Sequence, residues 1–393
     1  MRAKRGLVVL VSALLCALVA SGTVRASWTI GRVDTAGNVG LFTSLALNPN
    51  TGYASISYYD QTNYALKFAS YDGHLWNTQT VDTGQVGAHC SLALLADGTP
   101  CITYYDYPNH ALKYAVRDGL NWVTQIVDSS ADVGEHASLS IDRWGLPHVA
   151  YFDRTHGTLK YATYNGTSWT TQPVDTVATY GFQTSRGNIS LKLDAYDSPC
   201  IAYHDEANGT LKYAYLNGST WAIAVADNSI EVGAHAALAL VGGAEPFIAY
   251  RDSTNGAVKF ADLDAYGNWQ TETVDTWGDV GYDVSLAADA HGNPWIAYLA
   301  GDPVADLRLA SLDGLWWHIL TIDSDGRVGE FTSIALDPST GAPRISYYDR
   351  TNGDLKFASM DVVTVPEPAT LALLAAGAVA VAASRRRRAT IPS

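Results

Sequence analysis

The chain has 393 residues, of which 47% are apolar and 16% are charged, a composition that supports a hydrophobic core and excludes an intrinsically disordered chain. The formal charge is −14, and since segments 1–26 and 365–393 hold eight of the basic residues, residues 27–364 carry 17 basic against 38 acidic groups. Such an acidic surface repels polyphosphates, which excludes nucleic acid as a partner and favours cations or neutral ligands.

The first 26 residues have the pattern of a secretory signal. Lys4 and Arg5 precede an apolar run over residues 6–20, and Val24-Arg25-Ala26 matches the positions that signal peptidase reads. We predict that residues 1–26 are a signal peptide, cleaved after Ala26 by signal peptidase. An N-terminal membrane anchor is the alternative, although the apolar run is short for a membrane span.

Residues 27–361 repeat one pattern seven times. Each copy contains a small apolar segment such as SLAL, a strand such as ISYYD that ends in Asp, a strand such as LKFAS that begins near a basic residue, and a Trp-containing strand such as WNTQTVD. Turn residues separate these segments, which predicts four antiparallel strands in each copy. The closing Asp residues are Asp60, Asp106, Asp153, Asp205, Asp252, Asp302 and Asp349, and the basic residues are Lys67, Lys113, Lys160, Lys212, Lys259, Arg308 and Lys356.

Four-stranded meanders that repeat every 46–52 residues predict an all-β fold, a seven-bladed β-propeller of four-stranded antiparallel blades. A solenoid is the alternative, but solenoids stack parallel strands and repeat faster. The seventh copy lacks its fourth strand, and SWTIGRVDT at residues 27–35 supplies an isolated one. We therefore predict that this N-terminal strand closes the ring as the outer strand of the last blade.

In a propeller, the first strand of each blade lies beside the central channel. The connections that precede the first strand and follow the second strand share one face, which we call the top face. Asn255-Gly256 and Asn352-Gly353 predict primed hairpin turns on this face.

Residues that recur in every copy are interpreted as structural. The recurrent Trp is predicted to wedge between blades, and the strand-ending Asp is predicted to pair with the Lys across one hairpin. A crown of acidic groups that binds a cation such as Ca²⁺ is the alternative for these Asp residues. The predicted pairs are Asp60–Lys67, Asp106–Lys113, Asp153–Lys160, Asp205–Lys212, Asp252–Lys259 and Asp349–Lys356.

The turn in SYDGHLW, residues 70–76, resembles the Asp-box of sialidase-type propellers. It lacks one residue between Asp and Gly, and Asn replaces the Asp at Asn165 and Asn217. The resemblance implies a similar hairpin turn on the bottom face, not sialidase activity.

Function is expected where the copies differ. Two residues after the Gly that opens each first strand, or one residue after it in the fourth copy, the residue type varies, and these side chains are predicted to ring the top mouth of the channel as a ligand site. Such a His-rich ring could also coordinate a metal, which the sequence leaves open, or could merely plug the channel. The ring residues are Phe42, His89, His136, Asn188, His235, Asp283 and Phe331.

The fourth copy carries about five extra residues in VATYGFQTSRGN, residues 177–188, before its first strand. This connection is predicted to put Tyr180, Phe182 and Arg186 on the top face, where they are further candidates for ligand binding; a neutral insertion is the alternative.

No phosphate loop, nucleophile elbow or zinc motif is present in the sequence, so we assign no catalytic residue and no cofactor. Arg154, Arg251 and Arg350 flank the strand-ending Asp in three copies and would suit a carboxylate clamp, but a matching Tyr–Glu pair is missing. Cys90, Cys101 and Cys200 are predicted to be mostly unpaired, buried thiols.

The C-terminal segment, residues 362–393, has three parts in a fixed order. Pro366-Glu367-Pro368 precedes an apolar segment at 371–383 and an Arg cluster at 385–388. This order resembles the PEP-CTERM sorting signal of Gram-negative bacteria. The resemblance implies recognition by an exosortase, transient membrane anchoring through a helical apolar segment, and delivery to the envelope surface or extracellular matrix. A plain tail anchor that is never cleaved is the alternative.

These observations predict an exported propeller that binds a carbohydrate or another extracellular ligand at the top-face mouth of its channel. A polysaccharide hydrolase or lyase that uses top-face carboxylates is one alternative. A structural or adhesive matrix protein without a discrete ligand is the other.

Overall fold

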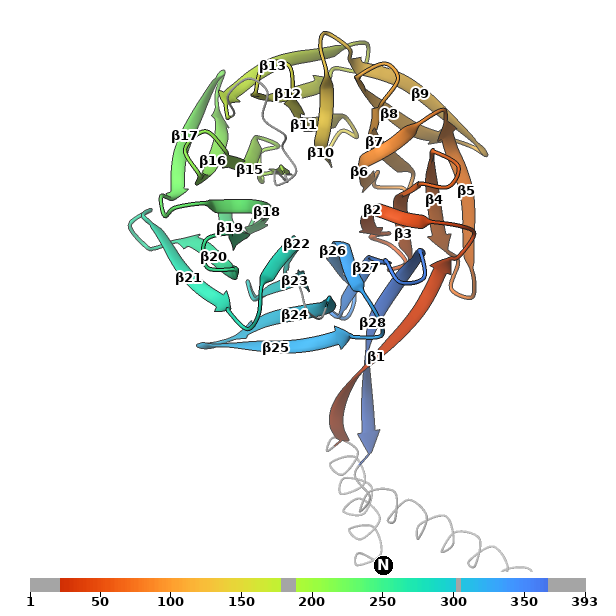
Figure 1. Cartoon of the computed structure of the whole chain (residues 1–393), viewed down its shortest axis with the longest axis vertical. Coiled ribbons are helices and arrows are strands. Elements are labelled where there is room, and N and C mark those ends of the chain that lie inside the picture. Colours follow the sequence, from red (N-terminus) through yellow and green to blue (C-terminus); the bar gives the residue numbers. More distant parts are fainter. Residues whose placement is uncertain (1–21, 178–188, 302–304, 367–393) are drawn as a thin grey trace, which may run out of the picture. The chain divides into compact units, whose positions relative to one another are not determined.

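A computed structural model describes residues 22–177, 189–301 and 305–366 of the chain. These residues form 28 β-strands in seven antiparallel sheets of four strands each (Figure 1), which confirms the predicted seven-bladed propeller. The helices predicted in the signal peptide and in the C-terminal tail lie outside the described residues. Within the described ranges, no helix has the length and apolar character needed to cross a membrane.

The blades are numbered in chain order from β2–β5 to the last, which combines β26, β27, β28 and β1. Their inner strands are β2 (Val39–Leu47), β6 (Val86–Leu94), β10 (Val133–Ile141), β14 (Ser190–Leu193), β18 (Val232–Val241), β22 (Val280–Ala288) and β26 (Val328–Leu336). The second strands are β3 (Ala54–Asp60), β7 (Pro100–Asp106), β11 (Pro147–Asp153), β15 (Pro199–Asp205), β19 (Glu245–Asp252), β23 (Pro294–Ala300) and β27 (Pro343–Asp349). The third strands are β4 (Ala65–Tyr71), β8 (Ala111–Asp118), β12 (Thr158–Tyr164), β16 (Thr210–Asn217), β20 (Ala257–Leu263), β24 (Asp306–Asp313) and β28 (Asp354–Pro366). The outer strands are β5 (Trp76–Thr83), β9 (Asn121–Asp128), β13 (Trp169–Thr176), β17 (Thr220–Asp227), β21 (Trp269–Asp275), β25 (Trp316–Asp323) and β1 (Gly22–Asp34).

The ring closes through strand β1, as predicted. The last sheet has the order β1-β28-β27-β26, so the first described strand of the chain is the outer strand of the seventh blade (Figure 1). Arg32 Nε lies 3.2 Å from Asp354 Oδ2, and Val33 packs on a buried cluster that also contacts Phe357. Closure of this kind pairs a sheet edge that would otherwise stay open.

The chain divides into two units, Ile30–Ser359 and the two ends, Met1–Thr29 with Met360–Ser393. The propeller ring belongs to the first unit. In the second unit, Thr29 Oγ1 donates a hydrogen bond of 3.0 Å to Asp361.

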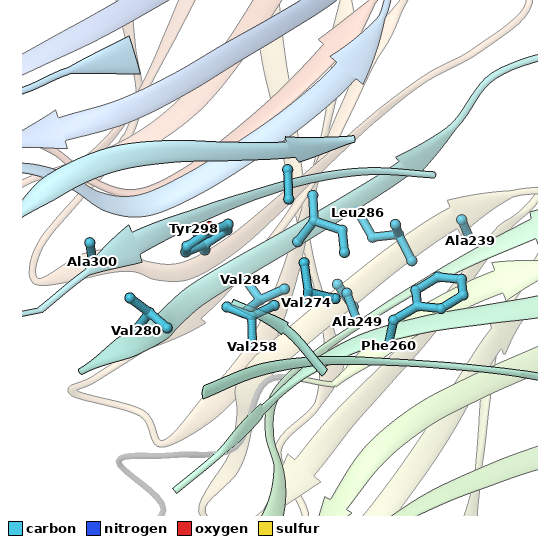
Figure 2. Packing of buried hydrophobic residues seen from close by; sticks show 13 residues of the cluster. Ala239, Ala249, Val258, Phe260, Val274, Val280, Val284, Leu286, Tyr298 and Ala300 are labelled. Carbon is cyan, nitrogen blue, oxygen red and sulfur yellow. The ribbon is translucent and has the colours of Figure 1, made fainter. Parts of the chain in front are cut away.

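The hydrophobic core lies between neighbouring blades. Where blades five and six meet, Val258, Phe260 and Val274 pack with Leu286 and Tyr298 (Figure 2). The second strands are buried on both faces because they lie inside each sheet and between two other blades. The Tyr that lies two residues before the end of each second strand is fully buried.

The recurrent Trp of the outer strand lies between blades at the rim, as predicted. In blades one to six, this ring meets an aromatic ring on the third strand of the preceding blade, with centroids 5.2–5.5 Å apart, in an edge-to-face arrangement. The pairs are Trp76–Phe357, Trp122–Phe68, Trp169–Tyr114, Trp221–Tyr161, Trp269–Tyr213 and Trp317–Phe260.

The prediction of primed two-residue turns was wrong. The strands of blade five pair up to Asp252 and Ala257, so the turn holds four residues, and of Asn255 and Gly256 only the glycine has a positive φ, +60°. The Asp252 carboxylate accepts hydrogen bonds from the backbone and side-chain amides of Asn255 at 2.9 and 2.8 Å. This side-chain cap stabilises a wider turn, which the Asn-Gly pair alone did not indicate.

Candidate functional site

Each fully described inner strand carries a bulge close to the channel mouth. In blade one, Leu41 pairs with Tyr59 and Ser44 pairs with Ser57, so the inner strand holds one residue more than its partner. The extra length places Phe42 in the left-handed region, with φ +54°. The described ring residues all share this conformation, with φ between +48° and +54°: Phe42, His89, His136, His235, Asp283 and Phe331.

The glycine two residues before each ring position allows the blades to approach closely. Gly87 has φ +111°, and a Cβ atom there would lie 2.7 Å from the Cα atom of Leu66 in the preceding blade. A larger residue would push the two blades apart. The Val-Gly pair at the start of the strand therefore fixes where His89 enters the channel.

Aromatic ring residues contact one another around one side of the mouth. The ring centroid of Phe42 lies 4.6 Å from those of both His89 and Phe331, and the His89 and His136 centroids are 4.5 Å apart. Burial lowers the pKa of His89 well below its usual value, and unfavourable electrostatic interactions with His136 and Arg154 add to the effect. His89 is therefore neutral and can both donate and accept a hydrogen bond.

Hydrogen bonds link the mouth residues of blades five, six and seven. The Asp283 backbone N–H donates to His235 Nδ1 at 3.2 Å, and the Phe331 N–H donates to Asp283 Oδ2 at 2.9 Å. Because Nδ1 accepts, the neutral His235 ring carries its proton on Nε2. Burial raises the pKa of Asp283 to about 6. The side chains remain 12% (His235) and 19% (Asp283) exposed, so both can meet a ligand.

A cavity of about 490 Å³ opens inside the ring. The six described ring residues line it together with Glu135 and Arg154 and a lower circle of serines. The serine hydroxyls accept hydrogen bonds of 2.9–3.0 Å from the inner strand of the next blade, which ties the channel wall together. Sequence reasoning missed these lining residues, whose signal was the Ser of the SLAL-like segments: Ser44, Ser91, Ser138, Ser190, Ser285 and Ser333.

The recurrent Lys has a nearer partner than the one predicted. Lys67 Nζ lies 4.0 Å from Asp60, but its short contact is with Asp34, at the end of the outer strand of the preceding blade. The Tyr58 hydroxyl donates to the same Asp34 carboxylate at 2.6 Å. Asp60 instead accepts hydrogen bonds from both amides of Asn63 and caps the top-face turn. The strongest contacts of the Lys therefore join blades to one another.

The same arrangement recurs around the ring. Lys113, Lys160 and Lys356 make short contacts with Asp82, Asp128 and Asp323, and lie 3.8–3.9 Å from their predicted partners Asp106, Asp153 and Asp349. Lys212 is an exception, because its predicted partner Asp205 is nearer, at 2.7 Å, than Asp175 at 2.9 Å. Among the described ion pairs, Lys259 joins Asp227 and not Asp252.

The three arginines beside the strand-ending Asp do not share a site. They belong to blades three, five and seven, and each contacts its own carboxylate: Arg154–Glu135 at 3.0 Å, Arg350–Glu330 at 3.0 Å, and Arg251–Asp279. The carboxylate clamp considered for them is therefore not formed.

Three predictions remain: the state of the cysteines, a metal site, and the candidate ligand-binding residues of the fourth copy. Cys90, Cys101 and Cys200 are free and buried, as predicted. In the part of the chain that the structure describes, no group of three or more His, Cys, Asp or Glu side chains is placed to hold a metal ion. Asn188, Tyr180, Phe182 and Arg186 lie outside the described residues.

A family comparison identifies the C-terminal segment. Residues 364–388, which include Pro366, Glu367 and Pro368, match the model of the PEP-CTERM protein-sorting motif. The chain carries a PEP-CTERM motif. This motif indicates export and surface sorting in bacteria, and it implies processing by an exosortase. No curated protein sequence matches the chain.

Solved structures share the propeller fold. The BP39L lectin from Burkholderia pseudomallei superposes with a TM-score of 0.64 at 14% identity, over 82% of this chain and 96% of the lectin. A protein of unknown function from Dyadobacter fermentans gives a TM-score of 0.53 at 12% identity, over 86% and 99%. The SapL1 lectin in complex with alpha methyl fucoside gives 0.51 at 14% identity, over 72% and 97%. At these identities the likeness shows the fold alone.

Proposed function

We propose that this PEP-CTERM protein is an exported binding module that holds a carbohydrate at the top-face mouth of its channel. The main support for this proposal is the cavity of about 490 Å³ at the mouth. Six inner strands each contribute one described side chain to the ring that surrounds it. Phe42 and Phe331 offer flat apolar faces to the C–H groups of a sugar, while His136, His235 and Asp283 offer hydrogen-bond partners to its hydroxyls. This volume and this mixture are typical of small-molecule sites.

Backbone strain at the ring supports a ligand-binding role. A residue other than Gly in the left-handed region destabilises the fold by about 1–2 kcal/mol. The described ring residues all accept this strain. Strained positions gather where a side chain must be aimed at a ligand, and here the bulge aims each ring residue into the channel.

Comparisons support the ligand class and the location. Two of the solved propellers are described as lectins, and one of them was solved with alpha methyl fucoside. We propose that residues 1–26 are a signal peptide, residues 27–361 the mature propeller and residues 362–393 the sorting segment that exosortase processes. The module would then stand on the envelope surface or in the extracellular matrix of a Gram-negative bacterium, where it would meet glycans.

A glycan array tests the proposal. The purified protein should retain a defined set of glycans, and His136→Ala and His235→Ala should each reduce that binding at least tenfold. The matched control is His318→Ala, which removes an exposed histidine from the outer strand β25, outside the cavity. Retention of no glycan, or equal binding by all three variants, would show the proposal to be wrong.

Two other results would assign a different function. Turnover of a polysaccharide that disappears in Asp283→Asn would identify a hydrolase or lyase. Mouth variants without effect, combined with altered biofilm on deletion of the gene, would identify a structural or adhesive matrix protein.

A further inference from the structure

A second hollow of about 490 Å³ lies on the top face between blades five and six. One wall is the turn after β19, which contributes Ser253, Asn255 and Gly256. The opposite wall is the start of blade six, where Asp279 and Tyr282 line the hollow. We call this hollow the groove. Three of its lining residues, Arg251, Ser253 and Tyr282, are of types that the equivalent positions of the other described blades do not carry.

The residue types at these positions explain why the groove forms here. The first residue of the corresponding turn is long in the other described turns, Gln61, Tyr107, Arg154, Glu206 and Arg350, whereas blade five has Ser253. The position of Tyr282 holds Leu41, Ala88, Glu135, Ala234 and Glu330 in the other described blades. A short side chain thus leaves room, and an aromatic ring forms the wall beside that room.

Tyr282 is held in one orientation before any ligand binds. The guanidinium carbon of Arg251 lies 3.8 Å from the centroid of the Tyr282 ring, and the Tyr282 hydroxyl donates to Asp279 at 2.8 Å. Arg251 is only 6% exposed and also donates to the backbone carbonyl of Val280 and to Asp279. A ring fixed by two partners, one of them buried, loses little conformational entropy when a ligand packs against it.

The groove adjoins the mouth cavity. His235 lines both, and its ring centroid lies 5.9 Å from that of Tyr282. Tyr282 and Asp283 are consecutive in β22, and the first lines the groove while the second lines the mouth. A ligand that leaves the mouth past His235 therefore enters the groove directly.

We propose that the mouth and the groove form one extended site, which binds a linear oligosaccharide with one sugar unit in the mouth and the next unit against Tyr282. This inference rests on the proposed function and names the length and path of the ligand. The extension lies where Ser253 and Tyr282 replace the residue types found at the equivalent positions of the other described blades, so the ligand would leave the mouth between blades five and six.

The chemistry of the groove favours a neutral sugar chain. Its lining provides the hydroxyls of Ser253 and Thr254 and the amide of Asn255, which are short groups that hydrogen-bond to sugar hydroxyls. The charge of Arg251 is already compensated by Asp279, so the described lining residues offer no uncompensated Lys or Arg to an acidic group. A peptide side chain would find no deep apolar pocket there, whereas the face of a pyranose ring can pack beside an aromatic ring.

A chain-length series tests the inference. The probes are methyl glycosides of glucose, galactose, mannose and fucose, and oligosaccharides of two to four units of the same sugars, measured with the purified full chain by calorimetry. We expect the best oligosaccharide to bind at least tenfold more tightly than its methyl glycoside. Ser253→Tyr, which installs the residue that blade two carries at this position, fills the groove and should abolish that gain without weakening the methyl glycoside.

Tyr282→Leu provides a second variant, because blade one already folds with Leu41 at the equivalent position. The matched control is Gln61→Tyr, the same loop substitution in blade one, which should keep the full gain. Thermal unfolding confirms that each variant is folded. The extended site is wrong if the wild type binds the oligosaccharide no more tightly than the methyl glycoside. It is also wrong if both groove variants keep the tighter binding of the oligosaccharide. Either result leaves a binding site at the mouth in place. If no probe binds at all, the proposed function fails as well.

Discussion

Asp283 should destabilise the folded protein at neutral pH. Its folded-state pKa of about 6 lies above the ordinary value of 3.8, because burial disfavours its charged form. The folded chain therefore holds a proton here that the unfolded chain releases, and the free energy of unfolding falls as the pH rises from about 4 to above 6. The difference between the two values corresponds to about 3 kcal/mol at pH 7.5.

Asp283→Asn removes this penalty. The amide oxygen can still accept the 2.9 Å hydrogen bond from the Phe331 N–H, so the bulge stays capped. We expect the variant to be more stable than the wild type by about 2–3 kcal/mol at pH 7.5 and equally stable at pH 3.5, as measured by urea unfolding at both values. Because other groups titrate identically in both proteins, the difference isolates this residue.

The matched control is Asp118→Asn, at an exposed strand end. It should change the unfolding free energy by less than about 0.5 kcal/mol at either pH. The reasoning would be refuted if Asp283→Asn did not raise the unfolding free energy at pH 7.5. It would also be refuted if the increase had the same size at both pH values.

Three further predictions follow from the ring, the interblade pairs and the thiols. His136→Gly should be about 1 kcal/mol more stable to urea than His136→Ala, the reverse of an ordinary strand position, because φ here is +53°; the opposite order would show that the bulge relaxes. Lys67→Met leaves the buried Asp34 without its cation and should lower the unfolding free energy by about 3–5 kcal/mol, most of it recovered when Asp34→Asn is added; an equal loss in the double variant would contradict this. Burial raises the pKa of Cys90 to about 12 and that of Cys101 to about 11, so a thiol reagent at pH 8 should label neither until the protein is unfolded, and rapid native labelling would be inconsistent with the structure.

The fold could be predicted because its signals are local and repeated. Each strand alternates with turn residues, and the same spacing recurs in all copies, so an error in one copy is corrected by the others. Ring closure followed from counting, since the seventh copy lacked the strand that residues 27–35 supply. Hydrophobic patterning and turn chemistry determine these features without reference to distant contacts.

Contacts between blades were harder to predict from the sequence. Asp60 and Lys67 face each other within one hairpin, so their pairing was the natural prediction, but Asp34 reaches the Lys from the preceding blade. The Asp that recurs at the end of each outer strand, or one residue before the end, was the available signal. A sequence pattern specifies register along a hairpin, whereas the offset between two stacked sheets depends on their twist and side-chain packing.

The candidate site was predicted in its ring residues but not in its serines or its backbone conformation. The variable position after the opening Gly correctly gave the side chains that line the cavity among the described blades. Nothing in Phe, His or Asp favours a left-handed backbone strongly enough to reveal the bulge beforehand. The groove was missed because Arg251 was considered with other arginines, and Tyr282 was not singled out at all.

The mouth is a part of the propeller in which local preference and global fold disagree in every described blade that reaches it. Elsewhere the interblade charges are paired, the aromatic rings interlock and glycine occupies the tightest approaches, so each choice stabilises the ring. At the mouth, the chain places large side chains where glycine would be easier and buries the Asp283 carboxyl with a raised pKa. A channel plug could be built from residues that relieve this strain, since any side chain of suitable volume would fill the space. Side chains that destabilise the scaffold are better explained by what they contact in the channel, which is why we place the ligand there and why stabilising substitutions at these positions should weaken binding.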